Sequence, residues 1–270
     1  ASAILTAYPH LGCKGAGPYK VEDRWGIFEN VLNVGNDKVF DLYDAVLKTV
    51  AGLFPFPYIH IGGDECPRTQ WKADPLCLKR IKDNNLASVD ELQAWTTKQV
   101  HGIARKYGKK IIGWDEILDG SDALGLPEDA VVMSWRGWEG GLKAASLGHK
   151  VIMCPTTGGC YLDHKNYDSY EEPGNLGVDT VQASYEFSPI PSSVQAVDHS
   201  SILGGQGNLW TEKIPFSRHA EYMLFPRLCA LAESLWLGDE KDFENFASRM
   251  DILHDQLDSL DIRYYQGPWV

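Results

Sequence analysis

Apolar residues recur along the chain with two different spacings. Helical spacing predicts long helices over Lys38–Leu53, Asp90–Tyr107, Glu139–Leu147, Arg218–Leu237 and Asp242–Leu260. Short apolar runs rich in β-branched residues predict strands at Tyr58–Ile61, Lys110–Trp114, Ala130–Trp135, Val151–Pro155 and Ser201–Gly204. Ser88 or Asp90 is placed to cap the second helix, and Gly108 is placed to end it. Strands and helices therefore follow one another along most of the chain.

This alternation predicts an α/β fold. Continuous apolar strands indicate a sheet that is covered on both faces, and such sheets are parallel. A (β/α)8 TIM barrel and a doubly wound open sheet both fit, because each places its ligand-binding groups beyond the C-terminal ends of the strands. Only five strands are predicted, whereas a closed barrel has eight. For a barrel, we therefore expect the N-terminal strands to be absent from this chain.

Length and charge narrow the classes of function. A chain of 270 residues, 44% hydrophobic and 23% charged, has the size of one large domain, so we predict a single domain over residues 1–270. The net charge of -12, without a cluster of Lys and Arg, disfavours nucleic acid as a partner. Apolar stretches such as Ala51–Ile61 are shorter than the roughly 18 residues of a membrane span. No signal peptide is visible, which leaves the localisation open, since a leader could have been removed.

The strongest chemical signal is His60-Ile61-Gly62-Gly63-Asp64-Glu65. Strand side chains alternate between faces, so both carboxylates can enter one site only if the backbone bends, which glycine permits. Two close carboxylates repel, and one of them is then expected to keep its proton near neutral pH and act as a general acid. Alternatively, Asp64 caps the next helix and Glu65 is solvated.

Aromatic and acidic residues also follow the later predicted strands, at Trp114–Glu116, Trp135, Tyr161, Asp163, Trp210 and Glu212. The eight histidines form neither an HxH pair nor HExxH, so no metal site is predicted. The glycines of Gly204–Gly207 do not form GxGxxG, and no cofactor is predicted. Six cysteines without a CxxC pair are typical of buried thiols.

Five motifs together resemble a known family. HxGGDE is followed by GWDE, VMSWRG, YLD and GNLWTE, which end at Glu116, Gly137, Asp163 and Glu212. In this order they resemble the β-N-acetylhexosaminidases of glycoside hydrolase family 20, over nearly the whole chain. The resemblance implies a TIM barrel that hydrolyses terminal non-reducing N-acetyl-D-hexosamine residues of oligosaccharides or glycoconjugates. It also implies a retaining, substrate-assisted mechanism, an exception to the usual pair of enzyme carboxylates.

The resemblance further implies three catalytic residues. Glu65 would protonate the glycosidic oxygen and later activate water. Asp64 would orient the acetamido N–H of the substrate while its acetamido oxygen attacks the anomeric carbon. Tyr161 would hydrogen-bond that acetamido oxygen. His60, Asp115 and Glu116 would support these groups from behind.

A sugar pocket is implied in the same way. Trp114, Trp135 and Trp210 match the aromatic walls of the family, and Phe187 stands where a fourth tryptophan is common. Asp163 and Glu212 match the residues that accept hydrogen bonds from the outer sugar hydroxyls. Phenylalanine at 187 is a departure, because it lacks the indole donor.

The segment SAILTAYPHLGC, at residues 2–13, resembles the stretch just after the third strand of the family. The strands before it supply an arginine, an aspartate and a histidine in relatives. Their absence would expose sheet edges, so association into homo-oligomers stays open. Relatives commonly act in the periplasm, outside the cell or in lysosomes, which makes an exported parent protein an expectation of the resemblance.

Two alternatives remain. The first is an ordinary retaining glycosidase in which Glu65 is the acid and Glu116 the nucleophile, with carboxyl groups about 5 Å apart. The second is a non-catalytic sugar-binding protein that keeps the aromatic pocket, against which both acids argue. The sequence does not distinguish N-acetylglucosamine from N-acetylgalactosamine, which differ only at the fourth hydroxyl.

Overall fold

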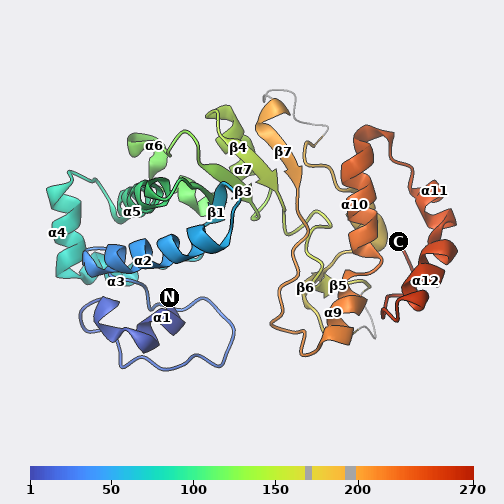
Figure 1. Cartoon of the computed structure of the whole chain (residues 1–270), viewed down its shortest axis with the longest axis horizontal. Helices are drawn as coiled ribbons and strands as arrows, with labels where there is room; N and C mark the ends of the chain where they lie inside the picture. The colour runs from blue at the N-terminus through green and yellow to red at the C-terminus, as the bar shows by residue number, and fades with distance from the viewer. Residues whose placement is uncertain (168–171, 192–198) are drawn as a thin grey trace. The chain divides into compact units, whose positions relative to one another are not determined.

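The computed structural model describes residues 1–167, 172–191 and 199–270, and Figure 1 traces the chain from its blue N-terminus to its red C-terminus. The described residues divide into two compact units, Ala1–Val132 and Met133–Val270. The chain passes from the first unit to the second within the strand β3 (Val131–Ser134). Each unit has its own buried apolar core.

The first unit combines helices with two parallel strands. Its elements are α1 (Ser2–Ala7), η1 (Pro9–Leu11), α2 (Lys38–Leu53), β1 (Tyr58–His60), α3 (Thr69–Ala73), α4 (Pro75–Asp83), α5 (Val89–Lys106), β2 (Lys110–Trp114), η2 (Asp115–Leu118) and α6 (Ser121–Leu124). In the parallel pair, Tyr58 lies opposite Lys110 and His60 opposite Ile112. The carboxyl ends of β1 and β2 therefore meet at one edge, where the predicted acids follow.

Two long helices position this strand pair. The helices α2 and α5 lie side by side (Figure 1), and Leu47 and Val100 belong to a buried cluster that includes Ile111 of β2. Ser88 is the N-cap of α5, because its hydroxyl accepts the N–H of Glu91 at 3.2 Å. Gly108, with φ 71°, follows the end of the helix. The loops after the strands thus start from a fixed support.

The second unit continues the parallel pattern. Its elements after β3 are α7 (Glu139–Ser146), β4 (Lys150–Met153), β5 (His164–Lys165), β6 (Asn175–Val178), α8 (Val181–Glu186), η3 (His199–Ser201), β7 (Ile202–Gly205), α9 (Ser217–Leu224), α10 (Arg227–Leu237), η4 (Gly238–Glu240), α11 (Phe243–Ser248) and α12 (Met250–Ser259). The strand β4 pairs in parallel with β7, with a register shift between Val151 and Ile152. The Cys154 N–H donates to Ser134 O at 2.8 Å, which joins the end of β3 to β4.

All five predicted strands are present, each within one or two residues of its predicted bounds. Two predicted helices are wrong as single elements. Arg218–Leu237 is divided because Pro226 has no N–H and restricts the residue before it, so α9 ends before the proline and α10 begins after it. Asp242–Leu260 is divided at Arg249, whose backbone (φ -99°, ψ 4°) leaves helical geometry.

Candidate functional site

The acid loop, Gly62–Glu65, leaves strand geometry immediately after β1. Gly62 and Gly63 have φ angles of 74° and 104°, and Glu65 itself has φ 47°. A non-glycine residue in this left-handed region is uncommon and is concentrated at functional sites. The predicted bend before the two acids is therefore confirmed, and it extends into the glutamate.

Close packing against η2 requires the second glycine. A Cβ atom on Gly63 would lie 2.6 Å from Ile117 Cγ2, and one on Gly113 would lie at the same distance from that atom. Ile117 is fully buried. Only glycine lets the acid loop and the end of β2 approach this side chain from both sides.

His60 supports the acid loop, in line with its predicted role behind the acids. The Gly62 N–H donates to His60 Nδ1 at 3.1 Å, so the proton of the neutral ring is on Nε2. The His60 and Trp114 rings lie with centroids 4.8 Å apart. Although His60 is exposed, desolvation by the surrounding protein lowers the pKa of the ring, and the charge of Asp64 opposes that shift.

The two acids differ in environment. Asp64 is half-buried and Glu65 is exposed, and both line a cavity of 440 Å³ whose walls include Phe28 and Trp71. Burial raises the pKa of Asp64, and the charge of Glu116 raises it further. The sequence prediction that one of these carboxyls holds its proton more tightly than usual is in the same direction.

Asp115 and Glu116 are buried at 1% and 8% exposure, so the loop after β2 is not a solvated one. Their position in η2, directly after Trp114, places them beside the acid loop because Trp114 N donates to Gly62 O at 2.9 Å. Glu116 acts on Asp64 through its charge. These residues and His60 thus gather around the acids within the first unit.

The second unit holds the other predicted residues, and Tyr161 is central among them. Tyr161 is 6% exposed and forms an isolated parallel bridge with Asn208. Burial raises the pKa of Tyr161, and hydrogen bonds with the side chains of Trp210 and Asn208 oppose that shift. The phenol therefore stays protonated and can donate a hydrogen bond. Tyr161 and Trp210 thus lie within hydrogen-bonding distance of each other.

Asp163 is a buried carboxylate, at 1% exposure. Burial raises its pKa, whereas hydrogen bonds from its own backbone and from Asn175 and Trp210, together with the charge of His164, oppose that shift. A carboxylate has two oxygens that can each accept more than one hydrogen bond, so Asp163 can also accept from a ligand.

The remaining predicted pocket residues differ in exposure. Phe187 is 3% exposed and packs so closely on β7 that a Cβ on Gly205 would lie 2.4 Å from its ring. Trp135 is partly buried, whereas Trp210 is 42% exposed and Glu212 is exposed. Phe187 is thus part of the packed interior of its unit.

Arg227, which the sequence did not single out, supports the segment that carries Tyr161 and Asp163. Its guanidinium is fully buried and donates to Leu162 O at 2.6 Å and His164 O at 2.9 Å. It also donates to the carbonyl oxygens of Met223 and Asp179. The only sequence signal was a charged residue in an otherwise apolar run.

The described part of the chain contains neither a candidate metal site nor a candidate membrane-spanning helix. There, no group of three or more His, Cys, Asp or Glu side chains is arranged to hold a metal ion. Among the same residues, no helix combines the length and the apolar character that crossing a bilayer requires.

Known proteins provide an independent comparison. The model of the glycosyl hydrolase family 20 catalytic domain matches residues 1–239. The chain is 43% identical to a beta-hexosaminidase of Porphyromonas gingivalis over 267 residues, which are 98% of this chain and 34% of that protein. It is 32% identical to a beta-hexosaminidase of Vibrio furnissii, covering 76% of this chain and 34% of that protein. The chain spans about a third of the length of these relatives.

Solved structures agree. The GH20 exo-β-N-acetylglucosaminidase of Vibrio harveyi, in complex with N-acetylglucosamine, matches with a TM-score of 0.85 at 30% identity, over 98% of this chain and 41% of that one. A Flavobacterium johnsoniae chitobiase matches with a TM-score of 0.82 at 32% identity, over 97% and 38% of the two chains. These neighbours are TIM barrels, which decides between the two predicted sheet arrangements. The chain belongs to glycoside hydrolase family 20 and has the fold of part of its catalytic barrel.

Proposed function

We propose that this chain is the acid-bearing part of a β-N-acetylhexosaminidase, which hydrolyses terminal non-reducing N-acetyl-D-hexosamine residues. We further propose that residues 1–270 function as one catalytic domain. The observation that carries the proposal is the acid loop, in which Glu65 adopts a left-handed backbone beside a half-buried Asp64. Such strain is retained where a side chain must be aimed. The relatives from Porphyromonas gingivalis and Vibrio furnissii are both named beta-hexosaminidases, which supports the same activity.

In the first step, the exposed Glu65 carboxylic acid donates its proton to the glycosidic oxygen as the bond to the anomeric carbon breaks. The acetamido oxygen of the substrate forms the new bond to that carbon, giving an oxazolinium ion. Asp64 accepts a hydrogen bond from the acetamido N–H and balances the developing positive charge. Burial and the charge of Glu116 raise the pKa of Asp64, and the positive charge that develops on the substrate favours its ionised form in this step.

In the second step, the Glu65 carboxylate removes a proton from water, and the water oxygen bonds to the anomeric carbon. The bond between that carbon and the acetamido oxygen breaks, so the configuration is retained and Glu65 is again protonated. The buried Asp115 and Glu116 side chains and the exposed His60 ring keep the two acids in position. Glu116, at 8% exposure, has this supporting role rather than that of a nucleophile.

The Tyr161 hydroxyl donates a hydrogen bond to the acetamido oxygen, which its raised pKa allows because the phenol stays protonated. Asp163 accepts hydrogen bonds from outer sugar hydroxyls through its carboxylate oxygens, and Glu212 does the same from an exposed position. Trp114, Trp135 and Trp210 offer aromatic faces to the sugar. Phe187, at 3% exposure, lies in the packed interior of its unit and is not assigned to the sugar. These assignments follow the order of the motifs along the chain.

The test is Glu65→Gln, measured on two N-acetyl-β-glucosaminides that differ in leaving group. A poor leaving group needs the acid, so we expect at least a roughly 10²-fold loss of kcat/KM there and a much smaller loss with nitrophenol. Glu244→Gln, which alters an exposed acid of α11, is the control. Equal losses on both substrates would remove Glu65 from its role. Faster cleavage of sugars without an acetamido group would instead favour Glu116 as nucleophile.

A further inference from the structure

One side chain bridges the acid loop and η2. Gln93, in the second turn of α5, is 6% exposed. Its Nε2 donates to Gly63 O at 2.9 Å and to Glu116 O at 3.2 Å. Gly63 immediately precedes the two acids, and Glu116 is the buried carboxylate that acts on Asp64. A single amide group therefore fixes the main chain on both sides of the acid cluster.

Arg68 fixes the orientation of this amide. Its Nη2 donates to Gln93 Oε1 at 2.7 Å. If the amide were reversed, its oxygen would face two carbonyl oxygens and its NH₂ group would face a guanidinium, which has no acceptor. The Gln93 amide therefore has only one orientation in which all these hydrogen bonds form. In that orientation its NH₂ group faces the carbonyl oxygens of Gly63 and Glu116.

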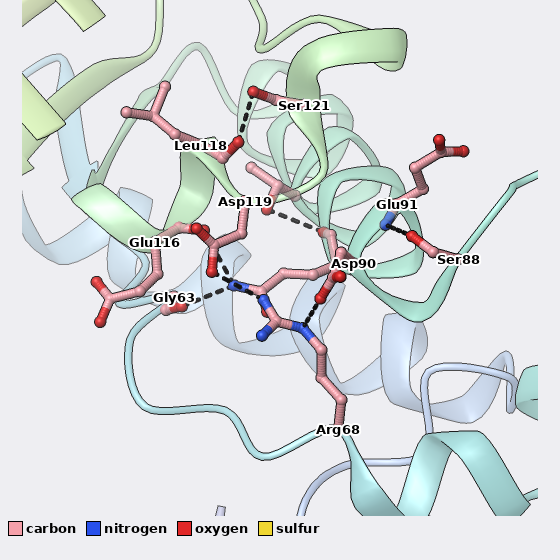
Figure 2. Close-up of polar contacts among 11 residues, drawn as sticks. Gly63, Arg68, Ser88, Asp90, Glu91, Glu116, Leu118, Asp119 and Ser121 are labelled. Carbon is pink, nitrogen blue, oxygen red and sulfur yellow. Dashed lines mark hydrogen bonds and ion pairs between the residues drawn. The ribbon is translucent and has the colours of Figure 1, made fainter. Parts of the chain in front are cut away.

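Arg68 is itself held by two carboxylates. Its Nε lies 2.9 Å from Asp90 Oδ1 in an ion pair, and its Nη2 donates to Asp119 Oδ2 at 3.0 Å. Figure 2 shows Arg68 between Asp90 and Asp119, with the Glu116 carboxylate pointing away from it. Asp90 belongs to the first turn of α5 and Asp119 follows η2. The guanidinium thus binds both α5 and the segment that follows η2.

These contacts act on a loop with an uncommon backbone. A left-handed φ at a non-glycine residue such as Glu65 costs free energy and persists where the surroundings determine it. Ile117 limits Gly63 on its Cα side, and Gln93 holds its carbonyl oxygen. Rotation of the Gly63 peptide would break the bond to Gln93, and that rotation is the motion that would turn Glu65 away.

We propose that Gln93 is a positioning residue for Glu65, and that Arg68 orients Gln93 for this task. The inference rests on the proposed role of Glu65 as the general acid. It adds a chain of contacts that runs from Asp90 and Asp119 through Arg68 and Gln93 to the Gly63 carbonyl oxygen. We assign both residues a role that acts through the backbone of the acid loop, by way of the Gly63 carbonyl oxygen. Their removal affects the proton donor through the backbone.

The experiment compares Gln93→Leu with Gln70→Leu. Gln70 is also partly buried in the first unit and makes two side-chain hydrogen bonds, to Asn30 Oδ1 at 3.0 Å and from the Val31 N–H at 3.3 Å, but it does not reach the acid loop. Both variants therefore lose a comparable amide. Amide hydrogen exchange over residues 61–67 and kinetics on substrates with poor and good leaving groups are measured for each.

We expect faster exchange over residues 61–67 in Gln93→Leu alone. For this variant we also expect kcat on the poor leaving group to fall about 10- to 100-fold, with KM nearly unchanged, because a displaced donor loses alignment more than substrate affinity. If Gln93 had a purely structural role, Gln93→Leu would lower kcat equally on both substrates, and Gln70→Leu would show the same loss. Unchanged exchange in Gln93→Leu, or equal losses on both substrates, would overturn the inference.

Gln93→Asn guards against a variant that does not fold, since it keeps the amide but shortens it by one methylene. It should show the same selective loss at a smaller size, and wild-type behaviour would count against the inference. Exchange does not depend on turnover. If the wild-type chain hydrolyses neither substrate, the proposed function fails, while the exchange of Gln93→Leu still decides whether Gln93 holds the acid loop.

Discussion

Gly63→Ala is the most direct perturbation of the acid loop. The new Cβ would lie 2.6 Å from Ile117 Cγ2, on a residue whose φ is 104°. Two other glycines of the first unit provide a graded comparison. At Gly62 (φ 74°) the nearest atom to a new Cβ is Asp64 Oδ1 at 3.4 Å, and at Gly102, inside α5, nothing lies within 4 Å.

The expected magnitudes follow from these environments. The left-handed backbone costs an L side chain roughly 1–2 kcal/mol, and forcing a methyl group into packed surroundings costs about 1–3 kcal/mol more. Gly63→Ala should therefore lower the free energy of unfolding by about 2–5 kcal/mol. Gly62→Ala carries only the backbone cost of about 1–2 kcal/mol. Gly102→Ala should raise stability by about 0.5–1 kcal/mol, because alanine is the better helix former.

Urea denaturation followed by far-ultraviolet circular dichroism measures all three variants on one scale. The order of stability should be Gly102→Ala, wild type, Gly62→Ala and then Gly63→Ala. If Gly63→Ala were no less stable than Gly62→Ala, the close approach to Ile117 would not constrain the loop. The argument that Gly63 is required between β1 and η2 would then be refuted.

Three further outcomes are expected. Burial raises the pKa of Asp64 in the folded state above its ordinary 3.8, so the ionisation of Asp64 destabilises the fold as pH rises. Asp64→Asn should therefore stabilise the chain at neutral pH. Urea titrations should show this gain disappearing below about pH 4. Arg227→Met should cost about 3 kcal/mol or more in thermal unfolding, because buried carbonyl oxygens lose a charged donor. Ser88→Ala should cost about 1 kcal/mol in the same assay through the lost α5 cap.

Most of the regular structure could be predicted because burial imposes a period on the sequence. The helix Lys38–Leu53 and the strand Lys110–Trp114 have their predicted bounds, since their apolar positions alone determine which face is covered. Pro226 is also a sequence signal for the end of a helix. The apolar spacing continues across this proline, however, and the prediction of one helix followed that spacing. Short helices such as α3 and α8 give too few turns for a period to be recognised.

The candidate site was predictable where backbone freedom is a property of the residue itself. Gly62 and Gly63 predicted a bend before the acids, and the bend is present. That Glu65 shares the left-handed conformation follows from its neighbours and not from its residue type. The exposure of the aromatic residues could not be predicted either, because an aromatic residue can belong to a core or to a sugar pocket. Phe187 is buried, whereas Trp210 is 42% exposed.

Gln93 and Arg227 mark what periodicity cannot reveal. Gln93 lies between the buried Leu92 and Ala94, and its partners are carbonyl oxygens 23 and 30 residues away. Every residue has a backbone carbonyl oxygen, whatever its side chain. The sequence therefore does not indicate which carbonyl oxygens lack a hydrogen-bond partner within a helix or sheet. Yet an irregular loop that is buried must find donors, because each unsatisfied acceptor is costly. The regular helices beside such loops must supply them. A buried polar side chain inside a helix therefore identifies, once the fold is known, the loop whose conformation it maintains.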